Sequence, residues 1–240
     1  MKSSKFTYTD ADEFIITPPE EDRAQPRDPD GKFGSGSGGS TDKEDDDSFV
    51  GEMDAFFAEQ EEAADAAMGI TDLQADYVEG LDTEAVAVLS DYAGEGSGAV
   101  NKQSRGAPPP PLKGDAAMEA EYNAEVIEDA ISAAPSITAP VTVYRGLDLE
   151  AAVKMDRAAI GSTVIDRGFA STSTSQTAAG EFARGGSPML RITLLPGASA
   201  LSMQPFSKYD NELEVLIQRG TNYKITGKSG DFIDLEVGGT

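Results

Sequence analysis

The sequence contains no cysteine, no histidine and no tryptophan among its 240 residues. The absence of cysteine excludes disulfide bonds and a thiol nucleophile. The absence of histidine removes the usual general base of enzymes and the commonest protein ligand of transition metals. Acid–base chemistry in this protein must therefore use carboxylates, and we expect no bound metal.

Long apolar segments and positive charge are also scarce. No run of residues is apolar enough to predict a transmembrane helix, and the polar first residues are unlike a signal peptide. Asp and Glu number 43 against 19 Lys and Arg, which gives a net charge of −24. An acidic protein is repelled by nucleic-acid phosphates and by anionic lipid headgroups. We therefore expect no direct binding to DNA or to a membrane.

The first 47 residues differ in composition from the rest of the chain. They are rich in Pro, Gly, Ser and Asp and poor in residues that form a core, so we predict that residues 1–47 are disordered. Residues 48–69 follow as an acidic amphipathic helix, with apolar side chains at Phe49, Met53, Phe56, Phe57 and Met68. This helix is equally consistent with a docking site for another protein and with packing against the rest of the chain.

The remaining residues, 70–240, have the pattern of a globular α+β domain. Apolar residues at helical spacing predict helices over 71–79, 83–92 and 115–133. The pattern then changes to short strands, predicted at 141–145, 168–172, 189–195, 199–203, 213–218, 223–227 and 231–237, with short helices near 149–158 and 176–184. Helices first and strands later indicate an α+β fold. No GxGxxG sequence stands between a predicted strand and a helix, and no Walker sequence is present, which argues against Rossmann or P-loop nucleotide binding.

Three short motifs in this domain carry charged or hydroxyl side chains: Val143–Gly146, Phe169–Ser173 and Asn211–Leu216. Arg145 in the first motif can hold phosphate oxygens through two parallel hydrogen bonds. Glu212 and Glu214 in the third are two residues apart, so in a strand both side chains would lie on one face. Taken singly, each motif also fits an ordinary surface strand or turn.

The order of the three motifs resembles the R-S-E class of ADP-ribosyltransferases, in particular the enzymatic domains of clostridial binary toxins and the ADP-ribosyltransferases of bacteriophages. Further segments extend the resemblance over about residues 70 to 240: Leu89–Gly94, Ala99–Asn101, Arg105–Gly106, Pro205–Asn211 and Arg219–Ile225. The resemblance implies an ADP-ribosyltransferase fold, with N-terminal helices followed by a two-sheet β core. It also implies NAD as a co-substrate and no metal.

By the resemblance, Arg145 would bind the NAD phosphates, and the backbone of Gly146 would contact the nicotinamide amide. Arg184 is a second candidate ligand of the phosphates, although an ordinary surface charge explains it equally well. NAD binding is therefore expected to depend on guanidinium groups.

The resemblance also assigns the hydroxyl and carboxylate groups. Ser171 would brace the site and hydrogen-bond near Glu214, with Thr172 and Ser173 in structural support. Glu214 would hold the 2′-hydroxyl of the nicotinamide ribose and stabilise the oxocarbenium ion that forms as the nicotinamide–ribose bond breaks. Glu212 would orient and deprotonate the target guanidinium.

The loop before the glutamates, residues 205–211, resembles the loop with which this family reads its protein substrate. Phe206 and Tyr209 are the candidate exposed aromatics, and Tyr209 is preferred because it lies closer to Glu212 between polar neighbours. The alternative is that either side chain fills the edge of the domain.

These features predict an arginine-directed mono-ADP-ribosyltransferase that moves ADP-ribose from NAD onto a host protein and releases nicotinamide. Two alternatives stay open: an NAD glycohydrolase, in which water replaces the protein acceptor, and a non-catalytic protein that acts through its acidic N-terminal segment. Residues 27–36 resemble a short sequence motif seen in phage head proteins, although a flexible linker explains them equally well. We therefore favour a phage enzyme that acts in the host bacterial cytoplasm, with packaging in the virion as an option.

Overall fold

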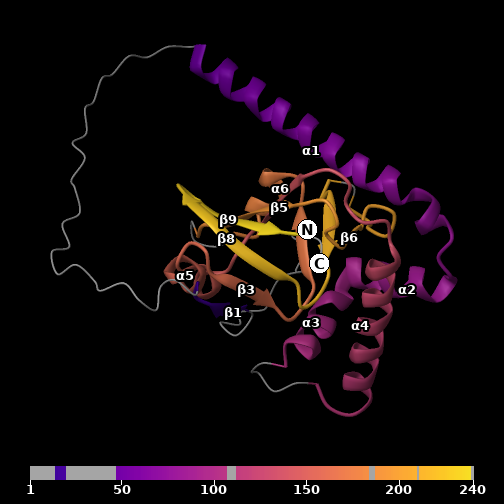
Figure 1. Cartoon of the computed structure of the whole chain (residues 1–240). Helices are drawn as coiled ribbons and strands as arrows, with labels where there is room; N and C mark the ends of the chain where they lie inside the picture. Colours follow the sequence, from indigo (N-terminus) through magenta and orange to yellow (C-terminus); the bar gives the residue numbers. More distant parts are fainter. Residues whose placement is uncertain (1–13, 20–46, 107–111, 184–186, 210, 239–240) are drawn as a thin grey trace, which may run out of the picture.

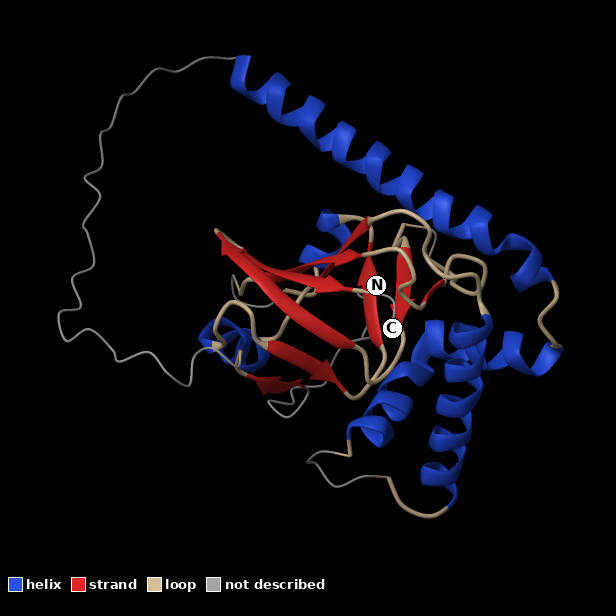
Figure 2. Cartoon of the chain, viewed as in Figure 1, coloured by secondary structure: helices blue, strands red, loops and turns tan. Residues whose placement is uncertain are grey.

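The computed structural model describes residues 14–19, 47–106, 112–183, 187–209 and 211–238, and within the first helix it describes side chains from residue 55 onward. Arg184 and the motif at residues 27–36 that resembles phage head proteins lie outside the described residues. After one short strand, the described chain forms helices first and the rest of a β-sheet afterwards (Figures 1 and 2).

The helices before the main run of strands are α1 (Asp47–Glu79), α2 (Thr83–Asp91), the π-helical turn η2 (Tyr92–Gly96), α3 (Ser97–Arg105) and α4 (Asp115–Ala133). α1 is continuous across the boundary predicted between residues 69 and 70, so the acidic helix and the first helix of the domain are one element. α2 begins after an N-cap, because the carboxylate of Asp82 accepts a hydrogen bond from the backbone N–H of Ala85 at 2.8 Å. α3 ends at Gly106, whose φ of 60° lies in the left-handed region that closes helices.

The strands are β1 (Phe14–Thr17), β2 (Val141–Arg145), β3 (Thr163–Asp166), β4 (Ala170–Ser173), β5 (Met189–Leu194), β6 (Ala200–Ser202), β7 (Glu214–Ile217), β8 (Asn222–Ser229) and β9 (Phe232–Val237). They are hydrogen-bonded in the order β1-β3-β8-β9-β5-β2-β4-β7-β6. Two short helices, α5 (Leu149–Arg157) and α6 (Gln176–Gly180), lie between strands. The predicted α+β class is confirmed, and the structure adds β1 and β3, which were not predicted from the sequence.

Hydrogen bonds join what was predicted as two sheets into one. β2 pairs with β5 along its whole length but with β4 only through Tyr144 and Ser173. This narrow link connects the β4-β7-β6 half of the sheet to the other half. The half that contains β2 and β3 is strongly curved, because the ends of these two strands meet although β8, β9 and β5 lie between them in the order: Nη1 of Arg145 is 3.2 Å from the carboxylate of Asp166.

Residues 14–17 contradict the prediction that the whole of segment 1–47 is disordered. They form β1, which pairs antiparallel with β3 from Phe14–Asp166 to Thr17–Thr163. Phe14 is 3% exposed and belongs to the apolar core. Four apolar or β-branched residues in polar surroundings carry too little periodicity to be recognised as a strand.

Two apolar clusters stabilise the domain. One consists mainly of side chains from the strands and from α5, such as Val143, Leu190 and Met155. The other lies where α2, η2, α3 and α4 pack on the sheet and includes Leu89, Ile127 and other buried side chains. Burial of such side chains contributes about 1.5–3 kcal/mol each, so these clusters supply the main favourable term in folding.

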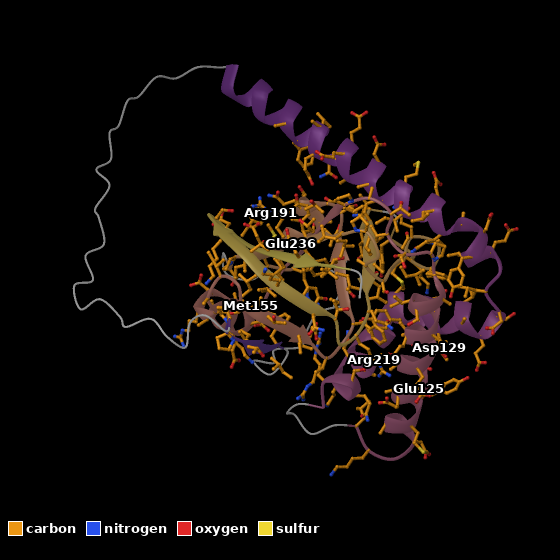
Figure 3. The ribbon with its side chains drawn as sticks, in the orientation of Figure 1. Glu125, Asp129, Met155, Arg191, Arg219 and Glu236 are labelled. Atoms are coloured by element: carbon orange, nitrogen blue, oxygen red, sulfur yellow. The ribbon has the colours of Figure 1, made fainter. Side chains whose placement is uncertain are left out.

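Polar contacts at the edges attach the helices to the sheet. Gln74 of α1 is fully buried, and its side chain donates to the carbonyl of Ala200 at 2.7 Å and accepts from the backbone N–H of Ser202 at 2.9 Å. Arg219, after β7, lies beside α4 in Figure 3, where its Nε donates to Glu128 at 2.7 Å. None of the described helices is long and apolar enough to cross a membrane.

Candidate active site

The fold brings the three motifs onto neighbouring strands. β2, β4 and β7 are adjacent in the sheet, with Tyr144 opposite Ser173 and Ser173 opposite Glu214. Arg145 is the last residue of β2, and Glu214 is the first residue of β7. The arginine, the Ser-Thr-Ser sequence and the glutamate therefore lie on three adjacent strands.

Arg145 is held by an ion pair. Its Nη1 donates to the carboxylate of Asp166 at 3.2 Å, and its side chain is only 12% exposed. The same carboxylate binds Arg105 through two bonds of 3.1 Å, from Nε and from Nη2. Two guanidinium groups and one carboxylate leave an excess of one positive charge, which suits an anionic ligand.

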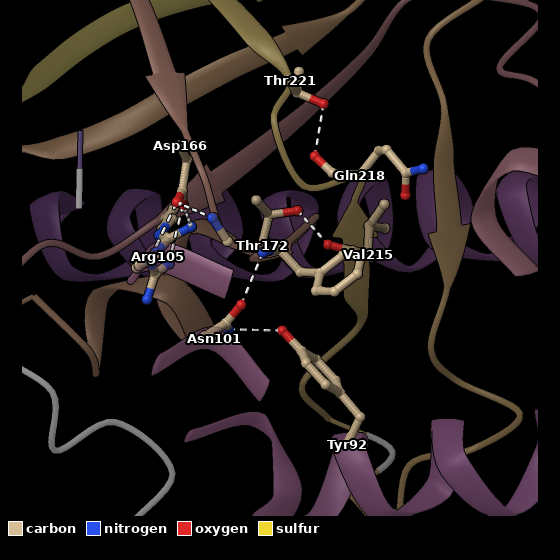
Figure 4. Close-up of polar contacts among 11 residues, drawn as sticks. Tyr92, Asn101, Arg105, Asp166, Thr172, Val215, Gln218 and Thr221 are labelled. Carbon is tan, nitrogen blue, oxygen red and sulfur yellow. Dashed lines mark hydrogen bonds and ion pairs between the residues drawn. The ribbon is translucent and has the colours of Figure 1, made fainter. Parts of the chain in front are cut away.

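A second chain of contacts starts at Asn101 of α3, the helix that also carries Arg105, and leads to the Ser-Thr-Ser strand β4 (Figure 4). Asn101 donates from Nδ2 to the hydroxyl of Tyr92 at 2.9 Å, and its Oδ1 accepts from the backbone N–H of Phe169 at 2.8 Å. The Tyr92 hydroxyl also hydrogen-bonds with Ser171 and lies near Glu214. Burial, and then the nearby negative charge of Glu214, raise the pKa of Tyr92 to about 12, so this hydroxyl stays neutral at physiological pH.

The two glutamates do not lie on one strand, contrary to the strand geometry expected for them. Glu214 begins β7 and is 8% exposed, whereas Glu212 is half-buried in the preceding turn. Leu213 between them has φ 45°, a left-handed conformation that costs a bulky residue about 1–3 kcal/mol. The turn is held by Ser173, whose hydroxyl donates to the carbonyl of Glu212 at 2.7 Å, and by the N–H of Thr174, which donates to the carbonyl of Leu213 at 3.2 Å. Backbone hydrogen bonds, and not strand alternation, decide how the two carboxylates are presented.

Two further predicted residues have clear packing roles. Thr172 donates from its hydroxyl to the carbonyl of Val215 at 2.6 Å, which strengthens the β4–β7 pair. Gly146 lies against the backbone after α6, where an added Cβ would be 2.5 Å from the nitrogen of Ala183 and 2.6 Å from the carbonyl oxygen of Ala179. The close approach of two backbones explains why glycine follows Arg145.

The two loop aromatics differ in burial. Phe206 is 6% exposed and packs in the cluster below the helices, so it fills the domain edge, which was the alternative for both residues. Tyr209 is 42% exposed. Of the two, only Tyr209 is accessible to a protein substrate.

Asp166 was not predicted from the sequence, and no role was predicted for Arg105, Tyr92 or Asn101, although three of these four stand in segments that carried the resemblance. A local signal for Asp166 was the sequence Asp166-Arg167-Gly168, because an Asp in a turn accepts from the backbone N–H two residues later, as it does here from Gly168 at 2.8 Å. A Cβ on Gly168 would lie 2.7 Å from Oδ1 of Asn101 and 2.8 Å from Nε of Arg105. The glycine is required because these two side chains pack directly on the backbone.

Acidic side chains do not gather into a metal site in the part of the chain that the structure describes. The arrangement instead provides guanidinium groups for an anion, hydroxyls that fix a strand pair, and a buried carboxylate beside them. These are the elements needed to bind a dinucleotide and to stabilise positive charge on a sugar.

The fold and this set of residues define an ADP-ribosyltransferase domain. The family profile described as ADP-ribosyltransferase exoenzyme matches residues 71–233. The chain belongs to this family. A comparison with curated protein sequences gave no match.

Solved structures of ADP-ribosylating toxins have the same fold. Plx2a, an ADP-ribosyltransferase toxin from Paenibacillus larvae, is 20% identical with a TM-score of 0.56, over 73% of this chain and 96% of that chain. BECa of a binary enterotoxin of C. perfringens, solved with NADH, is 23% identical with a TM-score of 0.59, over 72% of this chain and 48% of that chain. The ADP-ribosyltransferase Vis, solved in complex with agmatine, is 17% identical with a TM-score of 0.54, over 76% of this chain and 85% of that chain. At these identities the likeness concerns the fold.

Proposed function

We propose that this protein is an arginine-directed mono-ADP-ribosyltransferase that uses NAD and modifies proteins. The observation that carries this proposal is the meeting of Arg145, Ser171 and Glu214 on three adjacent strands in a chain of the exoenzyme family. BECa, solved with NADH, has the same fold and supports NAD as the co-substrate.

Each of the proposed site residues has a separate role in the reaction. Arg145 binds the pyrophosphate, and the backbone of Gly146 contacts the nicotinamide. Nicotinamide leaves when the bond between its ring nitrogen and the ribose C1′ breaks, and the ring nitrogen keeps the electron pair. The ribose then carries positive charge, which the buried carboxylate of Glu214 stabilises, and Ser171 braces this carboxylate. Glu214 acts through a charge interaction that becomes strong only as the bond breaks.

Glu212 acts on the acceptor. A guanidinium nitrogen of the target forms the new bond to C1′, and its proton passes to the Glu212 carboxylate. The half-buried position of Glu212 in a turn, next to the exposed Tyr209, suits contact with a second protein. Vis, whose structure contains agmatine, a guanidinium compound, supports arginine as the acceptor.

The test uses the full chain with NAD and agmatine, measuring nicotinamide release and ADP-ribosyl-agmatine separately. Glu214→Gln should lower both rates by roughly 10²–10³ or more, because it removes the charge that stabilises the oxocarbenium ion. Glu212→Gln should retain most of the NAD hydrolysis and lose transfer. Glu236→Gln, a change on β9, is the matched control and should keep both rates.

The outcomes separate the candidate functions. Nicotinamide release without labelled agmatine or labelled protein would support an NAD glycohydrolase instead. Near wild-type nicotinamide release by Glu214→Gln would refute the role of Glu214. Equal loss of both rates in folded Glu212→Gln would show that the two glutamates do not divide the work in this way.

We also infer that the enzyme is encoded by a phage and acts on proteins in the cytoplasm of the host bacterium. The resemblance of the motif at residues 27–36 to phage head proteins supports this origin. Mass spectrometry of purified virions and of host proteins after reaction tests it, because modified arginines should be found on host proteins. A docking partner for the acidic N-terminal segment is the second expectation, and cross-linking through exposed Phe56 and Phe57 of α1 would identify such a partner.

A further inference from the structure

Asp166 is a buried carboxylate that lies between two guanidinium groups, and Figure 4 shows its contacts with Arg105. It is 2% exposed and accepts two bonds of 3.1 Å from Arg105 and one of 3.2 Å from Arg145. The backbone N–H of Gly168 donates to the same carboxylate at 2.8 Å. Four charge-assisted or backbone hydrogen bonds fix the orientation of this carboxylate and of the guanidinium groups attached to it.

The backbone of Asp166 is held by β1. In the β1–β3 pair, Phe14 stands directly opposite Asp166. The carbonyl of Asp166 accepts from the backbone N–H of Gly220 at 2.8 Å. The ring of Phe14 also faces Arg145, with its centroid 6.0 Å from the guanidinium carbon, and Phe14 is 3% exposed. One residue of β1 thus contacts both members of the ion pair.

β1 is remote in sequence from the catalytic domain. It lies outside the matched family region, residues 71–233, and ahead of α1 in the chain. Figure 1 shows it beside β3 at the edge of the sheet. If β1 served only as an edge strand, Phe14 would need to be buried, but it would not need to lie against Arg145.

We propose that β1 is part of the NAD site and that Phe14 and Asp166 are positioning residues for Arg145. This rests on the proposed function, in which Arg145 binds the NAD phosphates. Asp166 holds one edge of the guanidinium and Phe14 faces it through a cation–π contact. The group is therefore oriented before the dinucleotide arrives, which lowers the ordering cost of binding.

Asp166→Asn separates positioning from simple electrostatics. Removing the negative charge makes the site more positive, so electrostatic attraction alone would make an anionic ligand bind more tightly. Positioning predicts the opposite result, because Asn cannot hold two guanidinium groups through charge-assisted bonds and the two cations then repel each other. The sign of the change in affinity distinguishes the two explanations.

The experiment measures the Kd of ADP-ribose by calorimetry, the KM and kcat for NAD hydrolysis, and inhibition by nicotinamide. Asp166→Asn should raise the Kd of ADP-ribose and the KM for NAD by about ten- to a hundredfold. Phe14→Leu, which keeps an apolar side chain, should raise both by about two- to fivefold. In both variants kcat and the inhibition constant of nicotinamide should change much less, because nicotinamide does not contact the pyrophosphate ligands.

A second Arg–Asp–Phe trio provides the matched controls. Arg191 pairs with Asp234 at 2.6 Å and lies 4.9 Å from the ring centroid of Phe232, but its side chain is 39% exposed. Asp234→Asn and Phe232→Leu should leave the Kd of ADP-ribose unchanged. Circular dichroism confirms that each variant is folded, and Phe14→Leu tests the proposal if Asp166→Asn does not fold.

Unchanged or tighter ADP-ribose binding by folded Asp166→Asn, or unchanged binding by Phe14→Leu, would overturn the positioning role while wild-type activity stands. A parallel loss of nicotinamide inhibition would also overturn it, since that result indicates general disruption. If the wild-type protein neither binds ADP-ribose nor releases nicotinamide from NAD, the proposed function itself fails, and this proposal fails with it.

Discussion

Replacing Tyr92 with phenylalanine removes one buried hydroxyl group and keeps the aromatic ring. The ring packs edge-on against Phe169 with centroids 5.9 Å apart, and this contact survives the change. The hydroxyl, in contrast, accepts from Nδ2 of Asn101 at 2.9 Å and hydrogen-bonds with Ser171. Because Tyr92 is 2% exposed, water cannot replace the lost group, and the free energy of unfolding should fall by about 1–3 kcal/mol.

The effect should also depend on pH in a defined direction. The pKa of Tyr92 is raised to about 12 in the folded protein, from 10.0 for a free tyrosine. Between pH 10 and 12 the unfolded chain loses this proton and the folded chain keeps it, so rising pH favours unfolding of the wild type. This contribution is about 1.4 kcal/mol per pH unit. Tyr92→Phe lacks it, and the difference in stability between the two proteins should shrink above pH 10.

Denaturant unfolding of both proteins from pH 7 to pH 11, with NAD turnover at pH 7, measures these changes. We expect kcat/KM to fall about tenfold, since Ser171 and Asn101 lose a shared partner. Tyr122→Phe is the control, because Tyr122 is 47% exposed and its hydroxyl donates to Glu84 on the surface. It should leave stability and turnover unchanged. A stability difference between wild type and Tyr92→Phe that is absent at pH 7, or that stays constant up to pH 11, would refute this account of the buried hydroxyl.

The other changes test packing and substrate choice. Gly146→Ala should sharply lower the thermal midpoint and the rate of nicotinamide release, because its Cβ would be 2.5 Å from the backbone nitrogen of Ala183. Gly98→Ala is the control: a Cβ there would meet nothing within 4 Å, so the free energy of unfolding should rise by about 0.5–1 kcal/mol. Equal thermal midpoints for the two variants would contradict the close approach at Gly146. Tyr209→Ala should change labelling of host proteins and spare NAD hydrolysis, as measured with labelled NAD in host lysate. Phe206→Ala should instead lower the free energy of unfolding by about 3–5 kcal/mol. If Tyr209→Ala labels host proteins as the wild type does, Tyr209 does not recognise the protein substrate.

Much of the fold around the candidate site could be predicted from the sequence, because the information is local. The run 141–145 alternates apolar and polar residues and forms β2 with the predicted bounds. Residues 115–133 have helical periodicity and form α4, also with the predicted bounds. The motif order was sufficient for the family, since the strands that carry Arg145, Ser171 and Glu214 are neighbours in its fold.

Local pattern was insufficient where the backbone leaves regular structure. The spacing of Glu212 and Glu214 predicts one strand face, but Leu213 takes a left-handed φ of 45° and Glu212 falls in a turn. Phe206 stands among turn-prone residues, which indicates exposure, yet it is buried below the helices. In both cases contacts with other elements outweigh the preference of the segment itself.

Periodicity and motif order, which are local properties of the chain, were enough to predict the fold class, the family and the residue types that we propose for the reaction. The tertiary structure alone decided that Asp166 lies between Arg105 and Arg145, and that Phe14 reaches the same place from β1. The physical reason is that the part of the sheet from β3 to β2 is curved and brings the ends of these two strands together, although β8, β9 and β5 lie between them. Contacts between residues so distant along the chain leave no periodic signal in either segment.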